Sequence, residues 1–225
     1  MCDPFGAPSL AVRPDRIRLR VVAHLLNVDE SLAEKIAEGL GMHTVPQATL
    51  PAVKPRKDLP ASDALSILKN GPNSFGGRKL GVFVSEGTDG ATFDALKTAV
   101  ESKNAVLAVI APTIGGVTDN NGRKIAANEK IDGGPSVLFD AIALLPGEGG
   151  IDELAGQPPV RDFISDALAH CKFIGFNKNG QQLMSSAGFG ARQDGGCISL
   201  DSTNVEETCI RFIESCAALR YWDRE

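Results

Sequence analysis

Three mostly apolar runs between residues 80 and 145 constrain the fold of this chain more than any other feature. A strand buried on both faces carries apolar side chains at every position, whereas a strand with one wet face alternates. Segments with apolar residues at helical spacing separate the runs, and Phe93, Leu96 and Val100 share one face of such a helix. The runs are residues 80–84, 105–110 and 139–145. Buried strands that alternate with helices predict a parallel sheet.

The residues that follow these runs extend the alternation. We expect a helix over 160–170, a fourth strand over 172–176 that turns at 177–180 into another helix, and a last helix from about 205 to 219. Residues 119–122 (Asp-Asn-Asn-Gly) have the composition of a hairpin tip. Right-handed crossovers between parallel strands place helices over the sheet. The pattern therefore predicts a doubly wound, mostly parallel α/β domain with helices on both faces.

The first part of the chain has a different character. Residues 31–34 (Ser-Leu-Ala-Glu) form a candidate capping box, and Leu32, Ile36 and Leu40 follow at helical spacing. Prolines and glycines then interrupt any regular pattern up to residue 77. We therefore expect a helical lead-in over 1–43, an extended linker over 44–78 and the α/β domain over 79–225.

Charge and composition exclude several classes of function. The net charge is −5, and basic residues gather only at Arg13–Arg20, where Asp15 interrupts them, so a solvated helix face is favoured over a nucleic-acid patch. No apolar stretch reaches the roughly 18–20 residues of a membrane helix, and no signal peptide is visible at the start. We expect a soluble protein with no nucleic-acid or membrane partner. The compartment stays open, because a targeting signal would lie outside this segment.

The cysteines do not form a self-contained disulfide set, because there are five of them. Cys209 and Cys216 are in line with Val205 and Phe212 on the last helix, which predicts buried structural thiols.

Four segments carry a resemblance to known proteins. Residues 20–29 (Arg-Val-Val-Ala-His-Leu-Leu-Asn-Val-Asp) resemble the closing segment of large-subunit haem catalases, just before their extra C-terminal domain. Residues 79–87, 138–146 and 174–180 resemble that extra domain, which belongs to the class I glutamine-amidotransferase-like superfamily. The resemblance implies a flavodoxin-like fold for the α/β domain.

The resemblance also locates a nucleophile position. Active members of the superfamily carry a cysteine on a strained turn between a strand and a helix, and here Lys178 stands at that position. An ordinary lysine ammonium is a poor nucleophile at neutral pH. The supporting acid falls near Asp89, for which a helix N-cap role is favoured over a catalytic one. We therefore expect a degenerate site without catalytic residues.

Two other cysteines are candidates to replace the missing nucleophile. Cys171 follows His170, but adjacent helical side chains point about 100° apart and do not make a Cys–His dyad. Cys197 follows two glycines, which leaves partial exposure and oxidation open.

No haem or metal site is expected in this chain. Catalases hold their iron with a tyrosinate, and the only tyrosine is Tyr221, which we interpret as ordinary packing beside Trp222. The histidines are scattered, at positions 24, 43 and 170. The loop after the first strand, residues 85–90, lacks the spacing and lysine of a P-loop. A small flavin or nucleotide at the sheet edge rests on fold analogy alone.

Three hypotheses follow from the resemblance. The first is a non-catalytic, stabilising C-terminal domain of a large-subunit catalase, whose parent disproportionates hydrogen peroxide with haem and whose partners are the catalase core and neighbouring subunits. The second is an ATP-independent holding chaperone that binds unfolded client proteins on exposed apolar surface. The third is residual hydrolase or deglycase activity at the degenerate elbow.

Overall fold

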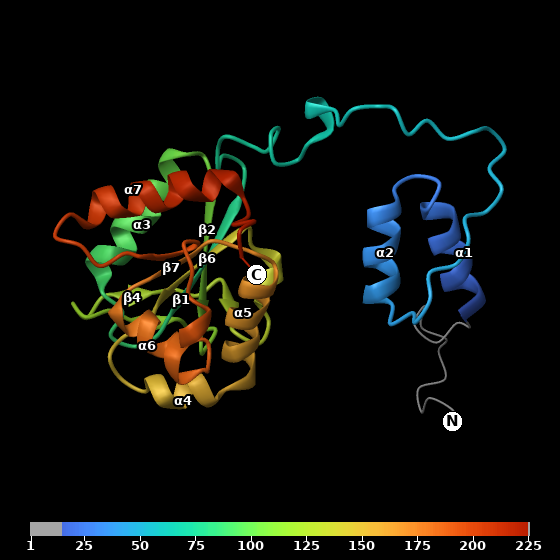
Figure 1. The fold of residues 1–225 in the computed structure, drawn as a ribbon. Coiled ribbons are helices and arrows are strands. Elements are labelled where there is room, and N and C mark those ends of the chain that lie inside the picture. Colours follow the sequence, from blue (N-terminus) through green and yellow to red (C-terminus); the bar gives the residue numbers. More distant parts are fainter. Residues whose placement is uncertain (1–14, 225) are drawn as a thin grey trace, which may run out of the picture. The chain divides into compact units, whose positions relative to one another are not determined.

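The computed structural model describes residues 15–224, and their contacts divide the chain into two units (Figure 1). The first unit is Met1–Asp63 and the second is Ala64–Glu225. Each unit has a hydrophobic core of its own, so each is described by itself.

The first unit is a pair of helices, α1 (Asp15–Leu25) and α2 (Glu30–Gly39), joined by a short turn. Small side chains fill the contact between them, with Val22 on α1 against Ala33 and Ala37 on α2. Of the expected apolar stripe, Ile36 and Leu40 are partly buried against this contact, whereas Leu32 is exposed. Of the basic run, Arg13 lies outside the described residues.

The start of α2 corrects the predicted capping box. Asp29, not Ser31, is the N-cap: its carboxylate accepts a hydrogen bond from the Leu32 backbone N–H at 2.9 Å. The Ser31 hydroxyl instead donates to Asp29 at 2.8 Å. A carboxylate at this position also interacts favourably with the positive end of the helix dipole, which explains why it displaces the hydroxyl.

The second unit is built on a six-stranded parallel sheet in the order β5-β2-β1-β6-β7-β8. The strands are β1 (Lys79–Val84), β2 (Val106–Ala111), β5 (Glu129–Lys130), β6 (Ala141–Leu145), β7 (Ile174–Phe176) and β8 (Cys197–Ser199). A small antiparallel hairpin of β3 (Val117–Thr118) and β4 (Lys124–Ile125) carries the predicted tip at its turn. The fold is the predicted doubly wound, flavodoxin-like one.

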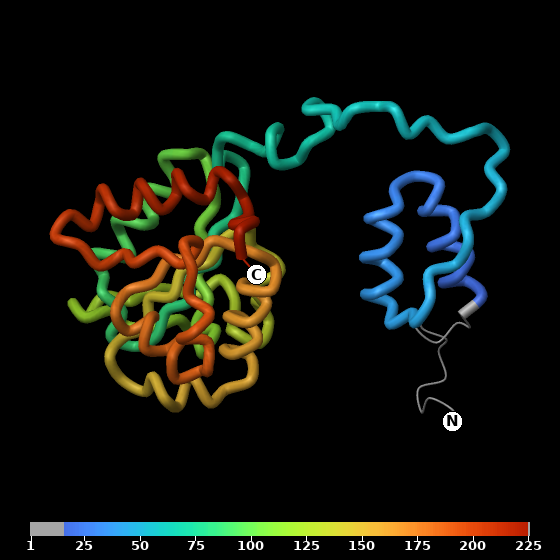
Figure 2. The backbone as a smooth tube through the Cα atoms, viewed as in Figure 1, coloured from blue at the N-terminus to red at the C-terminus, as the bar shows by residue number. Residues whose placement is uncertain are grey.

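Helices cover both faces of the sheet (Figure 1). One face packs against α3 (Gly90–Ser102) and α7 (Val205–Ser215), which run side by side in Figure 2. The other face packs against α4 (Ile151–Gly156), α5 (Pro158–Ala169) and α6 (Lys178–Ser186). The central strands are buried on both faces, as their continuous apolar runs predicted.

The stretch before the sheet has little regular structure. It contains one short 3₁₀ turn, η1 (Asp63–Leu65), and then meets the domain at Phe75, which is 1% exposed within the core. Three further 3₁₀ turns, η2 (Ser136–Leu138), η3 (Gly190–Arg192) and η4 (Cys216–Ala218), lie between the elements of the domain. The last helix ends at Ser215, earlier than predicted, and η4 follows it. Among residues 15–224, no helix has the length and apolar character needed to cross a membrane.

Candidate functional site

Ligands of doubly wound folds bind at the carboxyl edge of the sheet, where the strand order reverses. In this sheet the reversal falls at β1, because β2 lies on one side of it and β6 on the other. The loops that follow β1 and β6 therefore border the position where a ligand would enter. The turn after β7, which carries Lys178, lies at the same edge.

The two loops at the reversal pack directly against each other. The Gly147 backbone N–H donates to the Ser85 hydroxyl at 2.9 Å, and the buried Thr88 hydroxyl donates to the Leu145 carbonyl at 2.8 Å. A methyl group at Gly147 would lie about 1.9 Å from the Glu86 carbonyl oxygen. Only glycine permits this approach. The crevice between the strand ends is consequently filled by backbone and short side chains.

A shallow hollow of about 460 Å³ remains outside these loops. Its charged side chains are all acidic, and the polar remainder are amides: it is lined by Glu86, Gly87, Asp89, Asn120, Glu148, Gly149 and Asn179. Three carboxylates would repel a phosphate, and neither a cysteine nor a lysine lines the hollow. This composition does not fit a flavin phosphate or a nucleotide.

Asp89 caps α3, as the sequence predicted. Its carboxylate accepts hydrogen bonds from the Thr92 backbone N–H at 2.9 Å, from the Thr92 hydroxyl at 2.6 Å and from the Asn120 amide at 3.0 Å. Partial burial alone would raise the pKa of Asp89, but these hydrogen bonds lower it below its ordinary value. A carboxylate held in its charged form by three donors is a helix cap and a poor general base.

Lys178 is the first residue of α6 and is exposed to solvent. Its neighbour Asn177 is the N-cap, accepting a hydrogen bond from the Gly180 backbone N–H at 2.7 Å. The backbone at Lys178 is helical and has no positive φ angle. The turn has thus kept its place after the strand, whereas the strained backbone and the thiol of an active elbow are both missing from it.

The opposite, amino-terminal edge of the sheet holds a buried lysine. Lys172 precedes β7 and is 2% exposed, and its ammonium donates to the carbonyl oxygens of Ser136 at 2.5 Å and Phe139 at 2.6 Å. Burial, with a smaller contribution from the positive charge of Arg220, lowers the pKa of Lys172 to about 8. The lysine fastens the loop before β6 to the start of β7. It was expected only as part of a strand.

A second buried cation closes the same edge. The Arg224 side chain is 4% exposed, and its guanidinium donates to both carboxylate oxygens of Asp194, at 2.5 and 2.9 Å. It also donates to the Lys172 carbonyl oxygen at 2.7 Å. A bidentate ion pair of this kind fixes geometry as well as charge. No sequence signal pointed to this contact, because its partners are far apart along the chain.

Three of the described cysteines lie in environments that favour the thiol over the thiolate. Cys209 and Cys216 are buried, as predicted, and burial raises the pKa of both, that of Cys209 to about 11. Cys197 is half-buried, and burial also raises its pKa, although the Arg224 guanidinium lies 3.8 Å from its sulfur. Cys171 follows α5 with a positive φ of 52°. Cys197, Cys209 and Cys216 are therefore poor nucleophiles at neutral pH.

The described residues do not fit a haem. The Tyr221 ring packs edge-on against Phe173 at 6.1 Å, and its hydroxyl lies against Gly195, so it fills space within the domain. His24 contacts the Thr49 hydroxyl at 3.0 Å through its Nδ1 atom. Within residues 15–224, no group of three or more His, Cys, Asp or Glu side chains is arranged to hold a metal ion.

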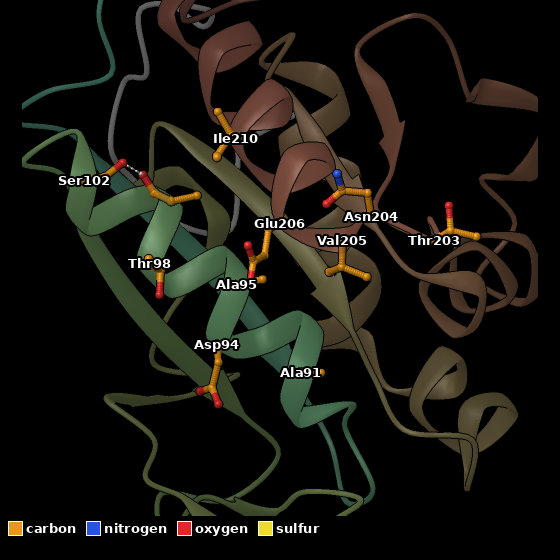
Figure 3. A pocket seen from close by; sticks show the side chains of 11 residues that line it. Ala91, Asp94, Ala95, Thr98, Ser102, Thr203, Asn204, Val205, Glu206 and Ile210 are labelled. Atoms are coloured by element: carbon orange, nitrogen blue, oxygen red, sulfur yellow. Dashed lines mark hydrogen bonds between the residues drawn. The ribbon is translucent and has the colours of Figure 1, made fainter.

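Another hollow lies between α3 and α7 (Figure 3). It encloses about 650 Å³ over small side chains of α3, with Val205 and Ile210 from α7. Asp94 and Glu206 also line it, and the Ser102 hydroxyl donates a hydrogen bond to the Ala99 carbonyl oxygen at 2.7 Å. The groove presents apolar surface but no convergent catalytic groups.

The comparisons with known proteins agree with this geometry. Residues 76–225 match the family model described as the C-terminal domain found in long catalases. The chain is 44% identical to Catalase C of Rhizobium meliloti over 93% of its own length and 29% of that protein. It is 31% identical to Catalase HPII of Pseudomonas putida, over 95% of this chain and 29% of that protein. The chain thus spans less than a third of these relatives, and it belongs to the family of C-terminal domains found in long catalases.

Proposed function

We propose that this chain is a non-catalytic, stabilising domain of a large-subunit catalase, whose haem-containing region disproportionates hydrogen peroxide. The packing of Gly147 against Glu86 carries the proposal, because it fills the crevice in which related folds bind ligands. The exposed, unstrained Lys178 supports the same conclusion. The partners would be the haem-containing region and the neighbouring subunits of the catalase.

A chimaera tests this function. Catalase C of Rhizobium meliloti would be shortened by the part that this chain covers, and this chain would then be fused in its place. We expect the chimaera to survive heating with a half-life at least about fivefold longer than the shortened enzyme, since new packing slows unfolding. An absorbance scan of the isolated chain should show no haem band. Equal half-lives for chimaera and shortened enzyme would contradict a stabilising role.

The groove between α3 and α7 favours a second candidate, an ATP-independent holding chaperone. Ile210 at the groove is 43% exposed, and apolar surface of this kind binds other chains. A chaperone should suppress thermal aggregation of an unrelated labile enzyme at near-stoichiometric amounts. Ile210→Asp should then abolish the protection, whereas Val137→Asp, on another exposed turn, should leave it intact.

Hydrolase or deglycase activity finds no support in the geometry. It would need a nucleophile at the elbow, and the residue there, Lys178, is exposed to solvent. Burial raises the pKa of the Cys197 thiol and makes that thiol a poor replacement. The stabilising role therefore remains the first proposal and the holding chaperone the second.

A further inference from the structure

The segment 50–68 carries an unusual load of exposed apolar side chains. Each of six large residues is between 63% and 98% exposed: Leu50, Val53, Leu59, Leu65, Ile67 and Leu68. Single exposed apolar residues are normal on a soluble protein and need no explanation. Six of them within one short segment mark a surface for another protein.

In the first unit, hydrogen bonds at Thr49 hold the start of this segment, and the apolar side chains that follow are exposed to solvent. The Thr49 backbone N–H donates to the Ala23 carbonyl oxygen at 3.1 Å, and the Asn27 amide donates to the Thr49 carbonyl oxygen at 2.8 Å. Leu50 and Val53 follow directly and are 98% and 82% exposed. The backbone is thus anchored where these side chains begin.

In the second unit, a local turn presents the other apolar side chains. The Asn70 backbone N–H donates to the Ser66 carbonyl oxygen at 2.9 Å, and the Lys69 backbone N–H donates to the Ser66 hydroxyl at 3.2 Å. These backbone N–H groups are therefore bonded to Ser66 within the turn. Leu65, at 84%, and its neighbour Ile67, at 69%, remain exposed.

The reach of the segment limits what can cover it. Residues 51–62 contain no helix or strand, and fully extended at about 3.3 Å per residue they would span up to about 40 Å. The groove beside α3, a helix of 13 residues, is only about 20 Å long at 1.5 Å per residue. Fully extended, residues 51–62 would overrun one groove of a second copy. The relatives, in contrast, contain a much larger region that this chain does not cover, because the match spans 29% of Catalase C.

We propose that segment 50–68 is a docking strand that lays its six apolar side chains on the haem-containing region of a long catalase. This inference rests on the proposed function and specifies how the domain would be attached. The strand would contribute apolar burial along its whole length, whereas its polar backbone contacts stay with the units at either end. The surface that receives it must carry a matching apolar strip.

Limited digestion of the chimaera with trypsin tests the docking strand. Trypsin should cut the isolated chain after Arg56, Lys57 and Lys69, which are exposed. Because proteolysis requires the segment to leave its contacts, fusion should slow these cuts by about tenfold or more. A chimaera that is active and heat-resistant, yet is cut as fast as the isolated chain, would overturn the docking strand and leave the proposed function standing. A chimaera without added heat resistance would instead overturn the proposed function.

A triple variant and a matched control identify the contacts. Leu65→Ser, Ile67→Ser and Leu68→Ser together should return the cutting rate to within about threefold of the isolated chain. Ile114→Ser with Leu138→Ser changes comparably exposed apolar residues outside the segment and should keep the protection. Circular dichroism of the isolated variants should match the parent, because all five side chains are exposed. Equal protection in the triple variant and the control would overturn the docking strand.

Discussion

The two edges of the sheet are built in opposite ways. At the carboxyl edge, where this architecture normally binds ligands, Lys178 is solvated and Asp89 is used as a helix cap. At the amino-terminal edge, Lys172 and Arg224 are buried with nearly all their hydrogen-bonding capacity turned inward. Lys172, two positions before β7, is thus buried, whereas Lys178, two positions after β7, is exposed to solvent.

This contrast between the two edges indicates that the buried charged side chains hold distant segments of the domain together. Perturbed ionisable groups often mark active sites, but structural networks perturb them as well. The groups that bind Lys172 and Arg224 are backbone carbonyls and one carboxylate, and the hollow of about 310 Å³ beside Asp194 and Arg224 is lined by no lysine, histidine or cysteine. We therefore interpret the amino-terminal edge as a clamp that fixes the C-terminal residues to the sheet.

The largest effect is expected from breaking that clamp. Arg224→Ala would leave Asp194 without its cation and the Lys172 carbonyl oxygen without a donor. Removing one partner of a buried ion pair should lower the free energy of unfolding by about 3 kcal/mol. Urea unfolding, followed by circular dichroism and by the fluorescence of the single tryptophan, Trp222, measures it.

An exposed ion pair supplies the control for this prediction. Arg211 lies 3.9 Å from Glu207 on the surface of α7, so Arg211→Ala should change the free energy of unfolding by less than about 0.5 kcal/mol. Equal losses of unfolding free energy in Arg211→Ala and Arg224→Ala would show that the buried ion pair contributes no more to stability than an exposed one.

A comparable effect is expected from the titration of Lys172. Its pKa is about 8 in the folded chain and about 10.5 in the unfolded one, so between these values the unfolded state binds more protons. Stability contributed by this group should therefore rise with pH across that window, by about 3 kcal/mol in total. Arg220 opposes protonation of Lys172, and the carboxylates of Asp140 and Asp166 favour it.

Lys172→Met isolates this contribution, because the variant has no titrating group at the position. Urea unfolding of both proteins from pH 7 to pH 10.5 should show the parent gaining stability relative to the variant. If the free energies of unfolding of parent and variant changed in parallel with pH, burial would not destabilise the charged form of Lys172, and the prediction would be wrong.

The smallest effects are expected at the carboxyl edge. Asp89→Ala removes the cap of α3 and should cost about 1 kcal/mol. Lys178→Ala should be neutral or stabilise the domain by about 0.3 kcal/mol, because a cation at the start of α6 opposes the helix dipole. If Lys178→Ala lowered the free energy of unfolding by more than about 1 kcal/mol in the same assay, Lys178 would have a stabilising contact and would not be simply solvated.

Local patterns allowed much of the fold to be predicted. The runs that became β1, β2 and β6 are visible because strands buried on both faces need apolar side chains throughout. The edge strand β8 was not predicted, because its three residues are at most partly buried and include Ser199. Similarly, Asp29 and Ser31 are both good caps, and spacing alone favoured the wrong one.

In the candidate site, too, features that depend on neighbouring residues could be predicted, whereas contacts between distant residues could not. The turn at 177–180 and the cap at Asp89 depend on neighbours in sequence, and the residues themselves indicated both. The clamp could not be predicted, because Arg224 lies 30 positions from Asp194 and 52 positions from Lys172. A lysine at the start of an apolar strand was the one available hint, and it reads equally well as a solvated strand end.

The central claim is that the domain stabilises a long catalase through its fold and without chemistry at the carboxyl edge. The most direct test is the half-life of peroxide-disproportionating activity on heating the Catalase C chimaera, with the double change Asp89→Asn and Lys178→Ala or with Arg224→Ala. The account predicts that the carboxyl-edge variant keeps the half-life of the unmodified chimaera, whereas Arg224→Ala shortens it at least about threefold. A carboxyl-edge variant that loses activity or heat resistance, while Arg224→Ala keeps both, would contradict it.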